Sequence, residues 1–342
     1  MFHNMWILVA NNTWLSEKSL VFALLIIATS AVALTNGVNS MLNNNPVAQA
    51  QQQQEQTKIN KIWETPDELK NPESVVYAPK QDTLFVSNID GKPDEKDQKG
   101  FISKVSLSNG SITQLNWITG LNAPKGMVIS NNDSKLYVSD ITDLVEIDIA
   151  SGKIIKRYNA PGSTFLNDVA SDNQGNIYVS DTRTNSIYKL DTTLKSNNTS
   201  SLLLQVWLQS PELNGPNGLL YVDNNKNRLI VVSLGSDPSK PGGGMKVVDL
   251  ENKTISNLGK EGTTTPVGRL DGIESDSAGT HYYVTDNPVG KVYTVNADGT
   301  GYETLIDLER QGAADLEFIP NQNIIIIPLM QDNKLAAYKL AE

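Results

Sequence analysis

The feature that most constrains this chain is an internal repeat that begins after residue 57. Each clear copy contains a short apolar run, a turn rich in Asn, Asp and Gly, a second apolar run, a loop and a third run of alternating character. The four clearest copies span residues 125–148, 166–191, 216–233 and 270–296. Two weaker copies begin at Ser74 and Ala314, so the pattern occurs six times.

A fourth strand is predicted after turn residues in three copies, over residues 111–117, 153–158 and 302–308. Successive copies begin near residues 73, 125, 167, 217, 271 and 314. Four antiparallel strands per unit at this spacing are typical of a β-propeller. We therefore predict an all-β fold, a six-bladed β-propeller with four-stranded blades.

The two ends of the repeat region support this architecture. The sixth copy stops after its third strand, whereas residues 61–74 match residues 205–218, with Trp63 aligned to Trp207. An N-terminal strand containing Trp63 is therefore predicted to complete the last blade and close the ring, which removes an exposed sheet edge. Two packed antiparallel sheets are the alternative architecture, but they do not predict this complementation.

The region before the repeats divides into two segments. Residues 20–34 form an apolar stretch, shorter than the roughly 20 residues needed to span a bilayer, so residues 1–40 are interpreted as a signal peptide or an N-terminal membrane anchor. Residues 41–57 form an Asn/Gln-rich linker, and residues 58–342 form the propeller. We expect an extracytoplasmic protein, either secreted or anchored to the outer face of the membrane.

Composition excludes several function classes. The net charge of −10 argues against a nucleic-acid partner, because phosphate binding requires clustered Lys and Arg. The chain has no Cys, and His281 is the one histidine in the propeller region, so a thiolate zinc site and a histidine-rich one are not expected. No G-x-S-x-G motif accompanies His281, which disfavours a serine-hydrolase triad.

The candidate site follows from the repeat register. The first strand of each propeller blade lines the central axis, so the residues that begin these strands converge there. We call them the axial positions, and in blade order they are Glu73, Lys125, Asn167, Asn217, Asp271 and Ala314.

Four axial positions hold oxygen-bearing side chains that are uncommon in strands. One Glu, one Asp and two Asn supply hard oxygen donors that suit Ca²⁺ or another divalent cation. A purely structural explanation also exists, because Asn217 and Asp271 each precede Gly, as is common in turns. It explains Glu73 poorly, since a buried Glu without a partner is unfavourable.

At these residues the sequence resembles the propeller family that includes senescence marker protein, gluconolactonase and luciferin-regenerating enzyme, with relatives in paraoxonase and diisopropylfluorophosphatase. The resemblance covers residues 58–342 and rests on four short motifs in the order Glu, Asn, Asn, Asp. They are "PES" at 72–74, "LNDVASD" at 166–172, "PNGL" at 216–219 and "LDGIESD" at 270–276.

The resemblance implies roles for individual residues. It makes Glu73, Asn167, Asn217 and Asp271 the ligands of a metal, usually calcium, and Asp271 the candidate general base or nucleophile. The paraoxonase-type histidine pair has no counterpart, so a mechanism that needs it is not expected here.

Three further residues are predicted to bind substrate, namely Lys125, Asp168 and Asp315. For Lys125 two interpretations remain open, because it either binds a substrate anion or extends to solvent. Asp315 lies one residue beyond the axial position of its blade, and a role as a fifth metal ligand also remains open. The charged run at 89–100 is expected to be a solvated loop or part of a rim over the site.

The function predicted from the sequence is a Ca²⁺-dependent hydrolase of small lactone or ester substrates. It is expected to be a monomer, with membrane contact only through the N-terminal segment. The alternatives are a non-catalytic propeller that binds a ligand or partner, and a related propeller lyase or synthase.

Overall fold

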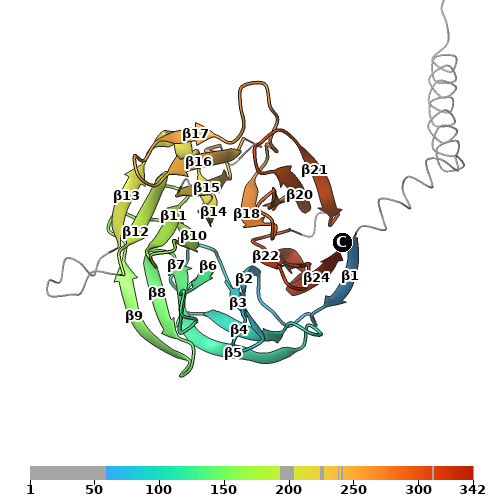
Figure 1. The fold of residues 1–342 in the computed structure, drawn as a ribbon. Helices are drawn as coiled ribbons and strands as arrows, with labels where there is room; N and C mark the ends of the chain where they lie inside the picture. The colour runs from blue at the N-terminus through green and yellow to red at the C-terminus, as the bar shows by residue number, and fades with distance from the viewer. Residues whose placement is uncertain are drawn as a thin grey trace, which may run out of the picture. The chain divides into compact units, whose positions relative to one another are not determined.

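Six four-stranded antiparallel sheets follow one another around a central axis in a computed structural model of the protein (Figure 1). The structure describes residues 59–192, 204–223, 227–237, 239, 242–309 and 312–341. The predicted signal peptide or anchor and the predicted linker lie outside these residues. No helix in the part of the chain that is described is both long and apolar enough to cross a bilayer.

The strands of each blade follow the chain outward from the axis. Blade 1 contains β2 (Pro72–Ala78), β3 (Thr83–Asn88), β4 (Gly100–Ser106) and β5 (Ile112–Leu121). Blade 2 contains β6 (Pro124–Ile129), β7 (Lys135–Asp140), β8 (Asp143–Asp148) and β9 (Lys153–Asn159). Blade 3 contains β10 (Leu166–Ser171), β11 (Ile177–Asp181), β12 (Ser186–Leu190) and β13 (Gln205–Gln209).

The second half of the ring repeats this order until the last blade. Blade 4 contains β14 (Pro216–Val222), β15 (Arg228–Ser233), β16 (Met245–Asp249) and β17 (Ile255–Asn257). Blade 5 contains β18 (Leu270–Ser275), β19 (His281–Asp286), β20 (Lys291–Asn296) and β21 (Tyr302–Asp307). Blade 6 contains β22 (Glu317–Ile319), β23 (Ile324–Leu329), β24 (Lys334–Leu340) and, as its outer strand, β1 (Ile59–Glu64). Two short 3-10 turns, η2 (Pro211–Leu213) and η3 (Met330–Asp332), lie in connections.

Ring closure occurs as the terminal match predicts. Strand β1 pairs antiparallel with β24, with Ile59 opposite Leu340. Trp63 on β1 donates a hydrogen bond from Nε1 to the carbonyl of Leu107 in blade 1, at 2.8 Å. Its ring covers Gly110, where an added Cβ would lie 2.5 Å from the indole and where φ is +71°. The tryptophan therefore joins the last blade to the first across a turn that only glycine fits.

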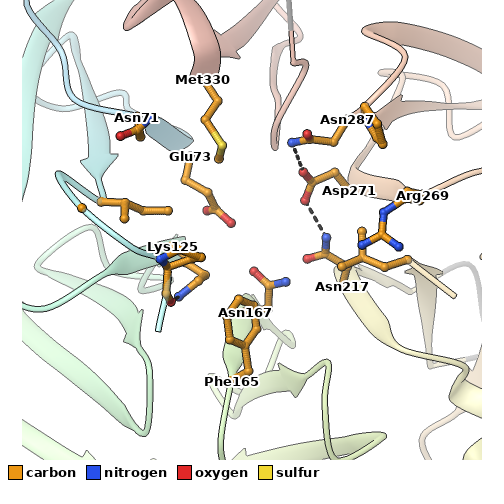
Figure 2. A pocket seen from close by; sticks show the side chains of 15 residues that line it. Asn71, Glu73, Lys125, Phe165, Asn167, Asn217, Arg269, Asp271, Asn287 and Met330 are labelled. Atoms are coloured by element: carbon orange, nitrogen blue, oxygen red, sulfur yellow. Dashed lines mark hydrogen bonds between the residues drawn. The ribbon is translucent and has the colours of Figure 1, made fainter. Parts of the chain in front are cut away.

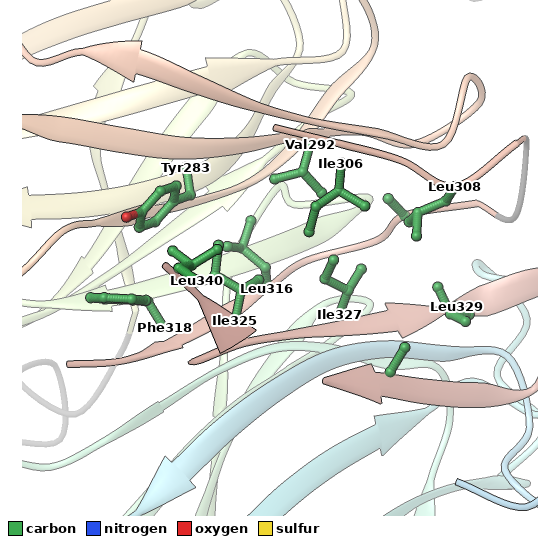
Figure 3. Close-up of a cluster of buried hydrophobic side chains, with 12 residues drawn as sticks. Tyr283, Val292, Ile306, Leu308, Leu316, Phe318, Ile325, Ile327, Leu329 and Leu340 are labelled. Carbon is green, nitrogen blue, oxygen red and sulfur yellow. The ribbon is translucent and has the colours of Figure 1, made fainter. Parts of the chain in front are cut away.

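Six hydrophobic clusters in the described part of the chain lie one at each interface between neighbouring blades. A seventh, smaller cluster contains Ile89, Ala123 and Ile141. Figure 3 shows the cluster in which Tyr283 and Val292 of blade 5 pack with Leu316 and Ile325 of blade 6. Alternating residues of each strand face one neighbour or the other, which is why the apolar runs in the sequence are nearly continuous. Packing on both faces fixes each blade and thereby the ends of the inner strands at the axis.

Candidate metal and substrate site

The inner strands carry an irregularity at the axial positions. In blades 1 to 5 the pairing of the inner strand with its neighbour shifts across these positions, for example between Leu166 and Val169. Such bulges redirect side chains and are common beside functional sites. Asn167 and Asp168 show the result, because these consecutive residues line two different cavities along the axis.

Hydroxyl side chains at the end of the second strands support the bulges. Ser180 Oγ accepts the N–H of Asp168 at 2.9 Å and donates to the carbonyl of Asn217 in the next blade at 2.8 Å. Thr285 Oγ1 accepts the N–H of Gly272 at 2.7 Å. The backbone groups that the bulges release from the ladders thus remain paired inside the ring.

An aspartate recurs one residue further along, at Asp140, Asp181 and Asp286, and it holds the loop before the inner strand. Asp181 Oδ2 accepts the N–H groups of Thr164 and Phe165 at 2.7 and 3.0 Å. Asp140 and Asp286 accept loop N–H groups in the same way. These contacts are structural, and they set the approach of each inner strand to the axis.

Five of the six axial side chains meet in one cavity of about 290 Å³ (Figure 2). They are Glu73, Lys125, Asn167, Asn217 and Asp271, all buried. The structure therefore brings together the four predicted metal ligands and one predicted substrate-binding residue. Ala314, the sixth axial residue, is buried as well.

Asp271 is held by two amide donors. Asn217 Nδ2 donates to Oδ1 and Asn287 Nδ2 donates to Oδ2, both at 2.6 Å. Burial raises the pKa of Asp271 to about 6, while the bonds from Asn287 and Asn217 oppose the shift. The carboxylate is thus fixed in orientation, and its ionised form is favoured by both neighbours.

Glu73 lacks comparable partners. Its Oε2 atom is buried and has no hydrogen-bond partner among the described residues. Burial and then the charge of Asp271 raise the pKa of Glu73 well above its ordinary value, and Lys125 partly opposes this. A buried carboxylate oxygen with no donor needs an explanation, and a cation supplies one.

The two axial asparagines leave oxygens available. Asn167 Nδ2 donates to Thr182 Oγ1 at 3.0 Å, and Asn217 Nδ2 donates to Asp271. With the amide nitrogens occupied, the carbonyl oxygens are the atoms left to serve as ligands. Two carboxylates and two amide oxygens fit Ca²⁺, which takes oxygen ligands and completes its shell with water or substrate.

This donor set differs from the usual transition-metal cluster. Within the described part of the chain, no group of three or more His, Cys, Asp or Glu side chains is arranged to hold a metal. The cavity contributes two carboxylates, and amides provide its other hard donors. The chemistry of the site therefore fits calcium better than zinc.

Lys125 does not extend to solvent, because its side chain is among the largest that are fully buried. Its Nζ donates to the carbonyls of Pro93 and Ala123 at 2.8 and 3.0 Å and lies 4.5 Å from the ring centre of Phe165. Burial lowers the pKa of Lys125 to about 8, and the charge of Glu73 opposes this change.

The loop between β3 and β4 forms part of the cavity wall. Pro93 lines the cavity and accepts the bond from Lys125, while Asp94 pairs with Arg183 at 2.8 Å. The charged run 89–100 thus combines both expectations, because it carries solvated charges and also covers the site.

Asp168 and Asp315 occupy a different place. They line a second axial cavity of about 170 Å³ together with Glu274 and Glu317. Ser74 Oγ donates to Asp315 Oδ2 at 2.8 Å, and the N–H of Leu219 donates to Asp168 Oδ2 at 2.6 Å. Burial raises the pKa of Asp315 to about 7 and that of Asp168 well above its usual value. Because Asp168 and Asp315 lie outside the first cavity, the structure gives no support for their contact with substrate, which stays a prediction.

Three polar residues that line the first cavity were not predicted from the sequence, Asn71, Arg269 and Asn287. The repeat register carried a signal for Asn287, because it follows the recurring Asp286 as Thr182 follows Asp181. Thr182 contacts Asn167, and Asn287 contacts Asp271. In blades 3 and 5 the residue at this register therefore makes a hydrogen bond with the axial side chain of its blade.

Comparison with known proteins supports the fold. No protein-family model matches the chain, and no curated protein matches it in sequence. A gluconolactonase from Xanthomonas campestris is similar in structure, with a TM-score of 0.58 and 16% sequence identity over 83% of this chain and 89% of that chain. A candidate gluconolactonase has a TM-score of 0.61 and 13% identity over 83% of this chain and 92% of its own.

These comparisons place the protein in a structural class. It is a six-bladed β-propeller whose structural neighbours are gluconolactonase-family propellers. The fold implied by the sequence resemblance is thereby confirmed.

Proposed function

We propose that this protein is a divalent-cation-dependent hydrolase of small lactones or esters, with Ca²⁺ as its metal. The observation that carries the proposal is the unpartnered carboxylate oxygen of Glu73, which shares one buried cavity with Asp271 and two amide oxygens. The structural likeness to gluconolactonases agrees with this chemistry.

Glu73, Asn167, Asn217 and Asp271 would hold the cation. When bound, it would supply Lewis-acid polarisation of the substrate carbonyl. The amide groups of Asn217 and Asn287 each donate to one oxygen of Asp271, and these two bonds fix the orientation of the carboxylate. This orientation suits a general base.

Asp271 would take a proton from a water molecule as the water oxygen bonds to the carbonyl carbon of the lactone. The ring C–O bond then breaks, and the proton passes from Asp271 to the leaving oxygen. The apolar side chains of Phe165, Leu234 and Met330 line the cavity and limit access of other water. The product is the hydroxy acid.

The test uses the purified full-length protein with a panel of lactones and aryl esters, with and without Ca²⁺. We expect hydrolysis that is lost after chelation and restored by Ca²⁺. Asp271→Asn should lower kcat by about 10²–10⁴-fold, the usual contribution of a general base. Glu274→Gln is the matched control, because it removes a carboxylate that lines the second cavity, and it should keep activity.

Absence of hydrolysis in every condition, with normal folding, would overturn the enzymatic proposal in favour of a binding module.

The apolar stretch at 20–34 supports an extracytoplasmic location. Fractionation of cells that express the full chain tests this, and recovery only in the cytosol would contradict it.

A further inference from the structure

Arg269 is a cation on the cavity wall with an unused donor. It lies two residues before Asp271, and its backbone N–H donates to Asp286 Oδ1 at 3.2 Å. Its side chain lines the cavity beside Asn217, on the side away from Lys125 in Figure 2. Its Nη1 is buried and has no hydrogen-bond partner among the described residues. An unpaired buried donor is unfavourable and calls for a specific acceptor.

Lys125 differs from Arg269, because its charged nitrogen already has hydrogen-bond acceptors. Two of its three N–H donors are used by the carbonyls of Pro93 and Ala123, and its charge faces Phe165. Lys125 therefore holds the covering loop in place. Of the two cations that line this cavity, Arg269 is the one with a buried nitrogen that has no hydrogen-bond partner among the described residues.

The charges of the cavity lining point to the type of acceptor. With a cation bound, both carboxylates, Glu73 and Asp271, would be ionised and contribute two negative charges. Lys125 and Arg269 contribute two positive charges. A divalent cation would leave this lining positive, which favours an anionic ligand. The planar guanidinium matches a carboxylate through paired N–H donors better than an ammonium does.

We infer that Arg269 binds a carboxylate carried by the substrate, so that the preferred substrates are small lactones bearing a negative charge. This inference rests on the proposed function, because it names the substrate class of the same site. The cavity of about 290 Å³ suits a ligand of single-ring size.

The experiment uses two lactones that differ in one group. D-Glucono-1,4-lactone carries a hydroxymethyl group where D-glucaro-1,4-lactone carries a carboxylate. We expect a higher kcat/KM for the glucarolactone with the wild-type protein, at one buffered concentration of free Ca²⁺. Arg269→Gln should raise KM for the glucarolactone at least tenfold and leave KM for the gluconolactone within about twofold. Arg269→Lys should restore part of the preference, because it keeps the charge but not the paired donors.

Arg228→Gln is the matched control, since Arg228 also has a buried nitrogen without a partner among the described residues but does not line this cavity. It should leave the preference between the lactones unchanged. Equal kcat/KM values for the two lactones would overturn the inference while leaving lactone hydrolysis intact. A ratio of the two kcat/KM values that Arg269→Gln does not alter would overturn it in the same way.

Calorimetry with the same two lactones separates the inference from the proposed function. If neither lactone is hydrolysed, tighter binding of the glucarolactone that Arg269→Gln abolishes would still support the anion site. Equal binding of the two lactones, or no binding of either, would overturn it.

Discussion

Glu73 and Asp271 reach the same axial cavity from blades 1 and 5, and the charge of Asp271 adds to burial in raising the pKa of Glu73. Asp271 receives two amide hydrogen bonds, whereas Glu73 Oε2 receives none from the described residues. Lys125 offsets only part of this unfavourable arrangement. A cation held between the two carboxylates would favour the ionised form of both.

Lys125→Met should destabilise the protein by about 2 kcal/mol, because the carbonyls of Pro93 and Ala123 lose their donor. Urea unfolding followed by tryptophan fluorescence measures the loss. Lys104→Met is the control, since Lys104 contacts the ring of Trp117 on an outer strand and should contribute less than about 1 kcal/mol. Equal losses for the two variants would contradict a structural role for Lys125 in holding the loop.

The second cavity predicts a pH dependence of stability. Burial, followed by the charge of Asp315, raises the pKa of Glu274 from an ordinary value of 4.5 to about 8. Between these values the folded state holds a proton that the unfolded state has lost, so this group makes stability fall as pH rises through that window. Below pH 4.5 both states are protonated, and the contribution is level.

Glu274→Gln should therefore gain stability relative to wild type as pH rises from about 5 to about 8, by on the order of a few kcal/mol. Chemical unfolding at several pH values in the presence of a chelator measures the difference. A constant difference between variant and wild type across this range would show that Glu274 ionises normally in the folded protein.

The contact of Trp63 with blade 1, which closes the ring, can be tested with two substitutions in β1. Trp63→Ala should lower the free energy of unfolding by about 2 kcal/mol, less than a fully buried tryptophan would, because Trp63 is only half-buried. Ile62→Ala on the same strand is the control, since Ile62 is 45% exposed and should change stability by less than about 1 kcal/mol. If the two variants lost the same free energy of unfolding, the indole of Trp63 would not stabilise the closure of the ring.

Much of the fold was predictable because propeller blades repeat. The inner strands begin at Pro72, Pro124, Leu166, Pro216 and Leu270, within one residue of the copies identified in the sequence. The last blade differs, because β22 is limited to three residues from Glu317 to Ile319.

The site was predictable only in part. Repeat register alone places Glu73, Asn167, Asn217 and Asp271 around one axis, and the structure brings them together. It does not reveal the bulges, which send Asp168 to a second cavity one residue after Asn167.

The position of Arg269 also escaped prediction. Arg269 lies in a loop before its strand, and the backbone of that loop is hydrogen-bonded to Asp286. Contacts of this kind depend on tertiary structure and leave no periodic signal in a single sequence.

Calorimetric titration of the metal-free full-length protein with Ca²⁺ tests whether the four oxygen-bearing axial residues bind calcium. We expect one bound ion for the wild type, no detectable binding by Glu73→Gln, and unchanged binding by the control Glu274→Gln. Bound Ca²⁺ at 100 times its Kd should stabilise the wild type by about 2.7 kcal/mol. Equal Ca²⁺ affinity of wild type and Glu73→Gln, or no binding to either, would rule out a calcium site at these residues.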